Sequence, residues 1–369
     1  MAPARIDETN MNPHPHFTRR GLSGALFAAA AAVTLAAALA TAPAQAQDAS
    51  LLNYEGPDRA ERVLAAAKKE GQLFLYTAFR PQDLPALVEG FEKKHGIKVT
   101  VWRSGATNVV QRVLKEAQGG RHEVDVVLMP SNETEMLRRE KLLQPVRTPF
   151  MKDLIANAVP AHREWAPVLL NVLVPTYNTK LVRKEDLPKT WTDLLDPKWK
   201  GKLGVESKLD EWYLAVIASM GEDKGTRFFN ELSQKNGLQA RLGMSLLNNL
   251  VISGEVPLAL AVYRDLPEKA KSKGAPIDWF LLDPIVAQAF VVSIPRRAPR
   301  SAAALLFHDY LLSEETQKML AGLDFYVANT KVQPPQANFR VQLVDPVYAV
   351  DNADRATKAF EDMLAGRGK

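Results

Sequence analysis

The sequence predicts an exported α/β protein of two lobes, and three observations carry this prediction. With 369 residues, of which 46% are apolar and 24% charged, the chain has an ordinary globular composition and is too long for a single minimal core. Short apolar strands alternate with amphipathic helices in two separate series along the chain. A short apolar segment near the N-terminus has the organisation of an export signal.

Residues 1–46 are predicted to be a cleaved signal peptide. Two arginines in residues 18–22 precede an apolar run over residues 25–40, and Ala44 and Ala46 supply the small side chains that a signal peptidase recognises. The run is shorter than the roughly 20 residues that cross a bilayer. Residues 18–22 also match a twin-arginine signal, so Sec and twin-arginine export both stay open.

The first series of elements predicts lobe 1, from residue 47 to residue 170. Apolar runs predict strands over 72–76, 97–102 and 124–129, and apolar side chains at helical spacing predict helices over 58–70, 84–95 and 107–118. Gly96 is placed to end the second of these helices. Strands that alternate with helices in this way indicate parallel βαβ units, whose ligands sit beyond the carboxyl ends of the strands.

The second series predicts lobe 2 over residues 171–290, a return to lobe 1 over 291–344, and a C-terminal segment over 345–369 on lobe 2. The sequence pattern predicts strands over 168–175, 202–206, 256–263, 277–282 and 287–294, and helices over 211–220, 224–234, 246–253, 302–312 and 314–321. The chain therefore passes between the lobes at least twice, and hinged lobes of this kind close on a ligand.

Composition and motifs exclude several classes of function. The chain has no cysteine, which excludes disulfides, thiolate metal sites and a lipid-modified N-terminal cysteine. Its formal net charge of +5 is spread along the chain without a basic stripe, so no nucleic-acid partner is expected. None of the four histidines after residue 46 has a partner at metal-ligand spacing.

Enzyme motifs are also missing, so no catalytic residue is predicted. The chain lacks a Gly-x-Ser-x-Gly elbow, a His-Glu-x-x-His pair and a phosphate-binding glycine loop. Glu123 and Asp125 have same-face strand spacing, but they stand where a strand begins, at the end opposite the expected cleft. A secreted hydrolase-like enzyme, or a sensory binding protein with the same two-lobed fold, remains the alternative to a solute-binding function.

Six segments of the mature chain carry a family resemblance, and the most specific is TWTDLLDPKWKGKL at residues 190–203. The supporting segments are LFLYTA (73–78), HGIKVTVWRSG (95–105), VDVVLMPS (124–131), VPTYNTKLV (174–182) and ISGEVPLALAVY (252–263). Together they resemble the periplasmic solute-binding proteins of ABC importers, and among them the ferric-iron-binding type (extracellular solute-binding protein family 1). The resemblance implies a type II periplasmic-binding-protein fold, in which each lobe is a mixed sheet flanked by helices and hinge strands join the lobes.

The iron site of this family carries over only in part. Where many members hold a tyrosine pair, this chain has Tyr263 followed by Arg264. Arg80 takes the place of a histidine that some members have after the first strand, Glu211 takes the place of a further tyrosine, and Pro130 the place of a carboxylate. Tyr263 and Glu211 are therefore the metal ligands expected if the cargo is ferric iron, a hard ion that prefers anionic oxygen.

A small oxyanion is the other expected cargo. Arg80 and Arg264 follow predicted strands, where a guanidinium group binds a carboxylate or phosphate through two hydrogen bonds, although both could be solvated surface arginines. The remaining candidates for ligand contact are Thr77, Ser104, Thr107, Ser131, Tyr177 and Trp212. The hydroxyl groups are equally suited to helix capping or turns, and the aromatic side chains to core packing.

These observations predict a periplasmic protein that captures a small molecule or metal ion and delivers it to an ABC permease in the inner membrane. The protein is expected to act as a monomer without a cofactor; ferric iron enters only as a transported ligand. Because the chain lacks cysteine, it is not expected to be a lipoprotein.

Overall fold

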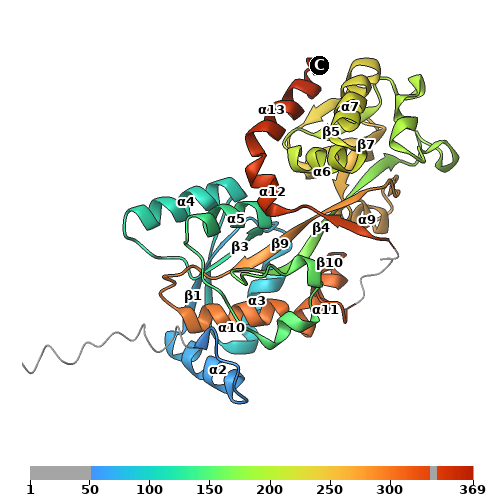
Figure 1. The fold of residues 1–369 in the computed structure, drawn as a ribbon. Coiled ribbons are helices and arrows are strands. Elements are labelled where there is room, and N and C mark those ends of the chain that lie inside the picture. The colour runs from blue at the N-terminus through green and yellow to red at the C-terminus, as the bar shows by residue number, and fades with distance from the viewer. Residues whose placement is uncertain (1–50, 333–338, 369) are drawn as a thin grey trace, which may run out of the picture. The chain divides into compact units, whose positions relative to one another are not determined.

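The computed structural model describes residues 51–332 and 339–368, so the predicted signal peptide lies outside it. The strands are β1 (Gln72–Thr77), β2 (Lys98–Arg103), β3 (Val126–Pro130), β4 (Ala166–Asn178), β5 (Leu203–Glu206), β6 (Gln239–Arg241), β7 (Leu258–Tyr263), β8 (Ile277–Trp279), β9 (Ile285–Ser293), β10 (Tyr326–Val327) and β11 (Val341–Leu343). Within the described residues they form one sheet in the order β2-β1-β3-β9-β4-β7-β5-β6, while β8 and β10 pair with β4 and β11 pairs with β9 (Figure 1).

The α-helices are α2 (Arg59–Glu70), α3 (Leu84–His95), α4 (Ala106–Gln118), α5 (Ser131–Arg139), α6 (Asp210–Met220), α7 (Glu222–Asn236), α8 (Met244–Ser253), α9 (Asp265–Ser272), α10 (Ser301–Leu312), α11 (Glu314–Gly322), α12 (Pro346–Asp351) and α13 (Ala353–Leu364). Short 3-10 turns connect several of these elements. In the part of the chain that is described, none of the helices has the length and apolar character needed to cross a bilayer.

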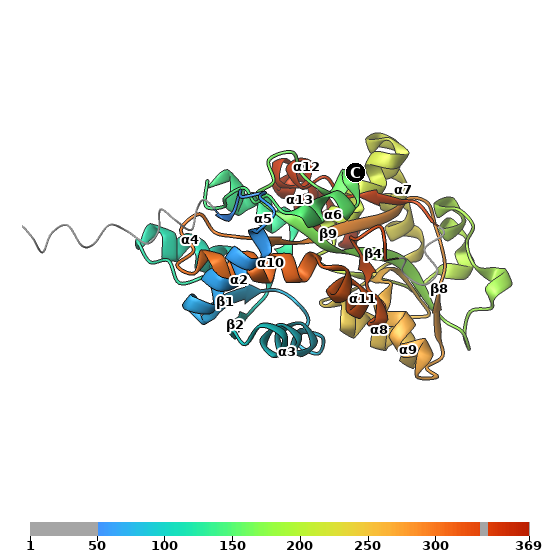
Figure 2. The same ribbon diagram turned by 90° about the horizontal axis from the view of Figure 1, so that it is seen from below.

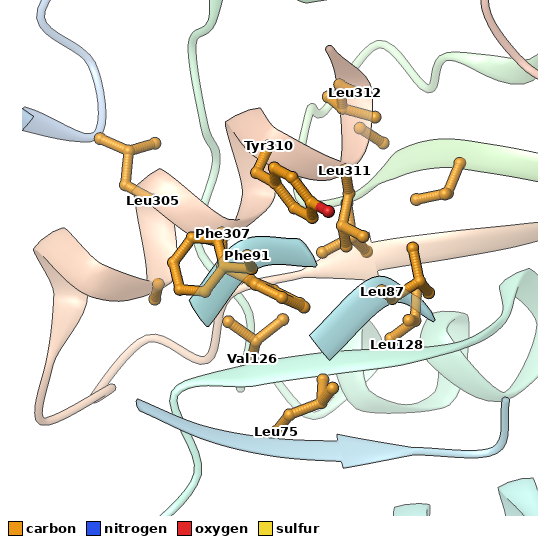
Figure 3. Packing of buried hydrophobic residues seen from close by; sticks show 14 of the residues in the cluster. Leu75, Leu87, Phe91, Val126, Leu128, Leu305, Phe307, Tyr310, Leu311 and Leu312 are labelled. Atoms are coloured by element: carbon orange, nitrogen blue, oxygen red, sulfur yellow. The ribbon is translucent and has the colours of Figure 1, made fainter. Parts of the chain in front are cut away.

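Lobe 1 is built on the parallel strands β1, β2 and β3, and β9 returns antiparallel beside β3. On one face of this sheet α2 and α10 lie together near β1 (Figure 2). Figure 3 shows part of the core of this lobe, where Leu75 and Val126 of the sheet meet Phe91 of α3 and Phe307 of α10. The Phe91 and Phe307 rings pack edge to face, with centroids 4.9 Å apart.

Lobe 2 has its own part of the sheet and its own core. Strand β5 is parallel to β6 and β7, whereas β4 runs antiparallel to β7. The core joins Trp212 of α6, Phe229 of α7 and Phe360 of α13. Helix α13 contacts α6 and α7.

Two strands continue from one lobe into the other. The first half of β4 pairs with β9 from Ala166 to Val172, and its second half pairs with β7 from Leu173 onward. Strand β9 likewise pairs with β3 at its lobe 1 end. Beyond residue 339 the chain adds β11 to β9 and then places α12 against α5 (Figure 1). The domain boundaries given above stay predictions.

The predicted α/β class and mixed sheets are confirmed, and most predicted elements are present with ends within a few residues. Gly96 ends α3 in the left-handed region, with φ of 69°. Strand β4 is longer than predicted, and the strand predicted over 277–282 already ends at Trp279. Helices α5, α9, α12 and α13 were not predicted, and three of them bear on the site or on the C-terminal segment.

Candidate functional site

The site lies where helices of both lobes begin, at the carboxyl ends of strands in the sheet. We define the interlobe cluster as Ser131, Asn132 and Glu133 at the start of α5, Glu211 at the start of α6, Tyr263 at the end of β7, and Gln288 of β9. The Gln288 side-chain amide donates a hydrogen bond of 2.8 Å to the Glu211 carboxylate. Helix starts at the carboxyl ends of strands are the usual ligand positions of α/β proteins.

The carboxyl groups of the cluster have pKa values above the ordinary value of a glutamate. Burial, followed by the negative charge of Glu211, raises the pKa of Glu133 to about 8. Burial raises the pKa of Glu211 to about 7, against the hydrogen bond with the Asn132 side chain that lowers it, and the charge of Asp210 adds to the rise. Burial and the nearby charges of Glu211 and Glu133 also raise the pKa of the Tyr263 phenol.

Two polar atoms of the cluster have no hydrogen-bond partner among the described residues. They are the Ser131 hydroxyl and one oxygen of Glu133. Ser131 is 2% exposed, so its hydroxyl has little access to bulk water. Buried polar groups normally find partners, and unpaired ones at a helix start are suited to receive a ligand.

The cluster also lacks a positive charge of its own. Within the described residues, no basic side chain contributes to the raised pKa values of Glu133 and Glu211. Two carboxyl groups and a phenol that share a buried site favour a ligand that brings positive charge.

The two arginines that were predicted to hold an anion have protein partners. Arg80 pairs with Asp265 of lobe 2 and lies 3.1 Å from the Asp83 carboxylate. Arg264, 5% exposed, donates a hydrogen bond of 2.8 Å to the main-chain carbonyl of Asp324. Their contact with a ligand stays a prediction.

The predicted hydroxyl groups fall into different surroundings. Thr77 is buried, donates to the Leu128 carbonyl and accepts from the Phe79 amide. Ser104 accepts a hydrogen bond from the Asn108 side chain, and Thr107 is exposed on α4. Ser131 is the one of these four that belongs to the interlobe cluster.

The two aromatic candidates lie in the core of lobe 2. Tyr177 is 4% exposed and packs edge to face against Phe280. Trp212 is 2% exposed and lies beside the rings of Trp191 and Phe229. The core-packing alternative describes the surroundings of both side chains, and a ligand contact by either stays a prediction.

A metal centre would have to use oxygen ligands from the interlobe cluster. No group of three or more His, Cys, Asp and Glu side chains suited to a metal occurs in the described part of the chain. Tyr263 and Glu211, the predicted metal ligands, share the cluster with Glu133, which sequence reasoning missed. Glu133 follows Pro130 by three residues, on a helix that the sequence pattern did not indicate.

Two other features lie apart from most of these residues. A cavity of about 1040 Å³ is lined by loop residues 157–165, the end of α6 and residues 340–347, and of the cluster only Ser131 reaches it. Asp125 is buried and accepts hydrogen bonds from Phe74 and Arg300. It therefore holds β1 and the start of α10 in place.

Comparisons with known proteins agree on one family. Residues 80–318 match the model of the family described as bacterial extracellular solute-binding protein. A protein of Salmonella typhimurium named "Putative 2-aminoethylphosphonate-binding periplasmic protein" is 28% identical over 249 residues, which are 64% of this chain and 71% of the relative. The Fe(3+)-binding periplasmic protein of Serratia marcescens is 25% identical over 194 residues, or 52% and 56% of the two chains.

Solved structures share the fold. Iron-bound HitA from Pseudomonas aeruginosa superposes with a TM-score of 0.70 at 21% identity, covering 79% of this chain and 99% of that one. AfuA from Actinobacillus pleuropneumoniae with bound fructose-6-phosphate gives a TM-score of 0.68 at 21% identity, covering 80% and 99%. The chain therefore belongs to the bacterial extracellular solute-binding proteins, and it is a substrate-binding protein of ABC transport rather than an enzyme.

Proposed function

We propose that the interlobe cluster captures a small zwitterionic solute of the aminophosphonate class, with an ammonium group at one end and an oxyanion at the other. The observation that carries this proposal is the pair of carboxyl groups, Glu133 and Glu211, with no cation beside them in the described residues. An ammonium group would supply the missing charge. The relative of Salmonella typhimurium named for 2-aminoethylphosphonate supports the same class.

The oxyanion end would bind at the start of α5. The Ser131 hydroxyl is buried there without a partner among the described residues. A helix N-terminus also provides free amide groups and a positive dipole end.

Ferric iron with a synergistic oxyanion is the second candidate. Tyr263, Glu211 and Glu133 offer three oxygen ligands in one cluster, and hard ferric ions prefer such ligands. The iron-binding relative supports this candidate. The missing second tyrosine, replaced by Arg264, is what places it second.

The proposed working cycle is closure of the two lobes about β4 and β9, followed by delivery to an inner-membrane ABC permease. Residues 47–170 and 291–344 would form lobe 1, residues 171–290 lobe 2, and residues 345–369 would lie on lobe 2. Export through the N-terminal signal would place the protein in the periplasm, where it would act as a monomer.

Isothermal titration of purified, ligand-stripped protein tests the proposal with 2-aminoethylphosphonate, ethylphosphonate and ferric citrate. We expect 2-aminoethylphosphonate to bind far more tightly than ethylphosphonate, which lacks the ammonium group. S131A should weaken that binding by about 1–2 kcal/mol because the phosphonate loses a buried hydrogen bond. S253A, at an exposed serine at the end of α8, is the matched control and should leave the affinity unchanged.

The same titration separates the two candidates. Tight ferric binding with a coloured tyrosinate-to-iron band, abolished by Y263F, would replace the aminophosphonate proposal with the iron candidate. Equal affinity for the two phosphonates would refute a site that recognises the ammonium group.

A further inference from the structure

Four charged side chains join the lobes near the interlobe cluster. Arg80 and Asp83 stand at the start of α3 in lobe 1, and Asp265 and Lys269 stand one turn apart on α9 in lobe 2. Arg80 pairs with Asp265, and Lys269 Nζ lies 3.0 Å from Asp83 Oδ1. Arg80 also lies 3.1 Å from Asp83, so the charges alternate and balance.

The four groups are much less exposed than a typical surface ion pair. The side chains of Asp83 and Asp265 are 7% and 8% exposed, and those of Arg80 and Lys269 are 19% and 26% exposed. Pairs shielded in this way are less screened by salt than exposed pairs. Removing one partner leaves a charge in a poorly hydrated site.

One aromatic ring of lobe 1 packs against both cations. The Arg80 guanidinium lies 4.5 Å from the centre of the Phe325 ring, and the Lys269 ammonium lies 4.9 Å from it. Phe325 itself is 3% exposed and belongs to the lobe 1 core. The cation–π contacts therefore anchor Lys269, a lobe 2 residue, on lobe 1.

Arg264 makes a further contact between the lobes. This lobe 2 side chain donates to the carbonyl of Asp324, which adjoins Phe325 and has a left-handed φ of 66°. The partners of Arg80 and Lys269 are separated from them by 185 and 186 residues along the chain. Because these contacts join one lobe to the other, they are lost when the lobes separate.

We propose that Arg80, Asp83, Asp265 and Lys269 form an interlobe latch that stabilises the closed arrangement of the lobes relative to the open one and thereby sets the affinity for cargo. The proposal rests on the interlobe cleft of the proposed function but does not depend on which cargo it holds. Apparent affinity scales with the fraction of protein in the binding-competent state. Weakening the latch therefore lowers affinity without removing any ligand contact.

Interlobe distances measured by pulsed electron paramagnetic resonance test the latch directly. Because the chain has no cysteine, spin labels can be placed at Q118C of α4 and K224C of α7, both exposed positions on opposite lobes. The distances are recorded for ligand-stripped protein with the native latch and with D265N or K269Q. K271Q is the matched control, since Lys271 lies on the same helix but pairs within lobe 2, with Asp278 at 2.8 Å.

We expect similar populations of short and long distances with the native latch and with K271Q, and a larger population of long distances with D265N and with K269Q. Both latch variants should also weaken cargo binding by about 3- to 10-fold. Unchanged distance distributions in folded D265N and K269Q, with folding verified by circular dichroism, would overturn the latch.

The proposed cargo and the proposed latch can each be contradicted without the other. An intact latch in a protein that binds none of the tested solutes would contradict the proposed function alone. Tight solute binding with no effect of the latch variants on distance or affinity would contradict the latch alone.

Discussion

At the scale of single residues, Glu133 and Glu211 make the ligand-free protein sensitive to pH. Their pKa values of about 8 and about 7 lie above the ordinary value of a glutamate. The folded protein therefore holds these protons more tightly than the unfolded chain does. The contribution of the two carboxyl groups to the free energy of unfolding is fully present below pH 4.5 and is lost as the pH rises through their folded-state pKa values.

Replacement of Glu211 by glutamine should stabilise the ligand-free protein at pH 8. The amide cannot ionise and can still accept the hydrogen bond from Gln288, so we expect the free energy of unfolding to rise by about 1–3 kcal/mol. Chemical denaturation at pH 5 and pH 8 measures this, and the gain should shrink at pH 5. No gain at pH 8 would show that the Glu211 carboxylate has a stabilising partner.

Replacement of Glu222 is a control that should change the free energy of unfolding in the opposite direction. Hydrogen bonds from Arg355 and Tyr348 lower its pKa to about 2. Its contribution is present above pH 4.5 and is lost as the pH falls through about 2. E222Q should therefore lower the free energy of unfolding at pH 8, where E211Q raises it.

Which site residues could be predicted depended on the kind of signal each one carries. Ser131 was suggested by its place after a predicted strand, whereas Glu211 and Tyr263 were suggested by the resemblance to the iron-binding family. Glu133, Asn132 and Gln288 gave no such signal, because neither composition nor spacing marks a buried polar side chain. Their part in the cluster comes from tertiary packing.

At the scale of elements, predictability followed the apolar pattern. Helix α3 and strand β4 were predicted because each has a regular apolar face or a continuous apolar run. Helix α5 was missed because it buries Ser131, Asn132, Thr134 and Glu135 along with Leu137, so polar residues occupy its inner face. Helix α9 was missed because its sequence is polar and contains Pro267. Of these two helices, α5 carries residues of the interlobe cluster and α9 carries residues of the latch.

Helix packing in lobe 2 depends on one glycine. Gly225 of α7 lies so close to α6 that an added Cβ would be 2.6 Å from the Cα atom of Ile217. Alanine favours an isolated helix over glycine by about 1 kcal/mol, yet G225A should lower the free energy of unfolding by about 1–3 kcal/mol because it overpacks this contact.

Gly322, an exposed residue of α11 with open space at the Cβ position, is the matched control for thermal or chemical denaturation. G322A should be neutral or slightly stabilising. A stabilising effect of G225A would mean that α6 and α7 can move apart without cost.

At the scale of the whole molecule, the sequence pattern indicated two lobes with at least two crossings, and β4 and β9 run between the two cores. The latch could not be predicted, because Arg80 and Asp265 are 185 residues apart and nothing in either neighbourhood specifies the other. For the same reason the sequence suggested Arg80 and Arg264 as anion ligands, whereas the fold gives both of them protein partners.

In the proposed function, the cargo brings positive charge to Glu133, Glu211 and Tyr263. A cation beside these groups favours their ionised forms, so binding should release protons near neutral pH, and affinity should rise with pH until about pH 8.

Proton release can be counted by titrating 2-aminoethylphosphonate or ferric citrate into ligand-stripped protein at pH 7, in buffers with different enthalpies of ionisation. We expect each binding event to release on the order of one proton or more. Binding without proton release, or with proton uptake, would contradict this expectation.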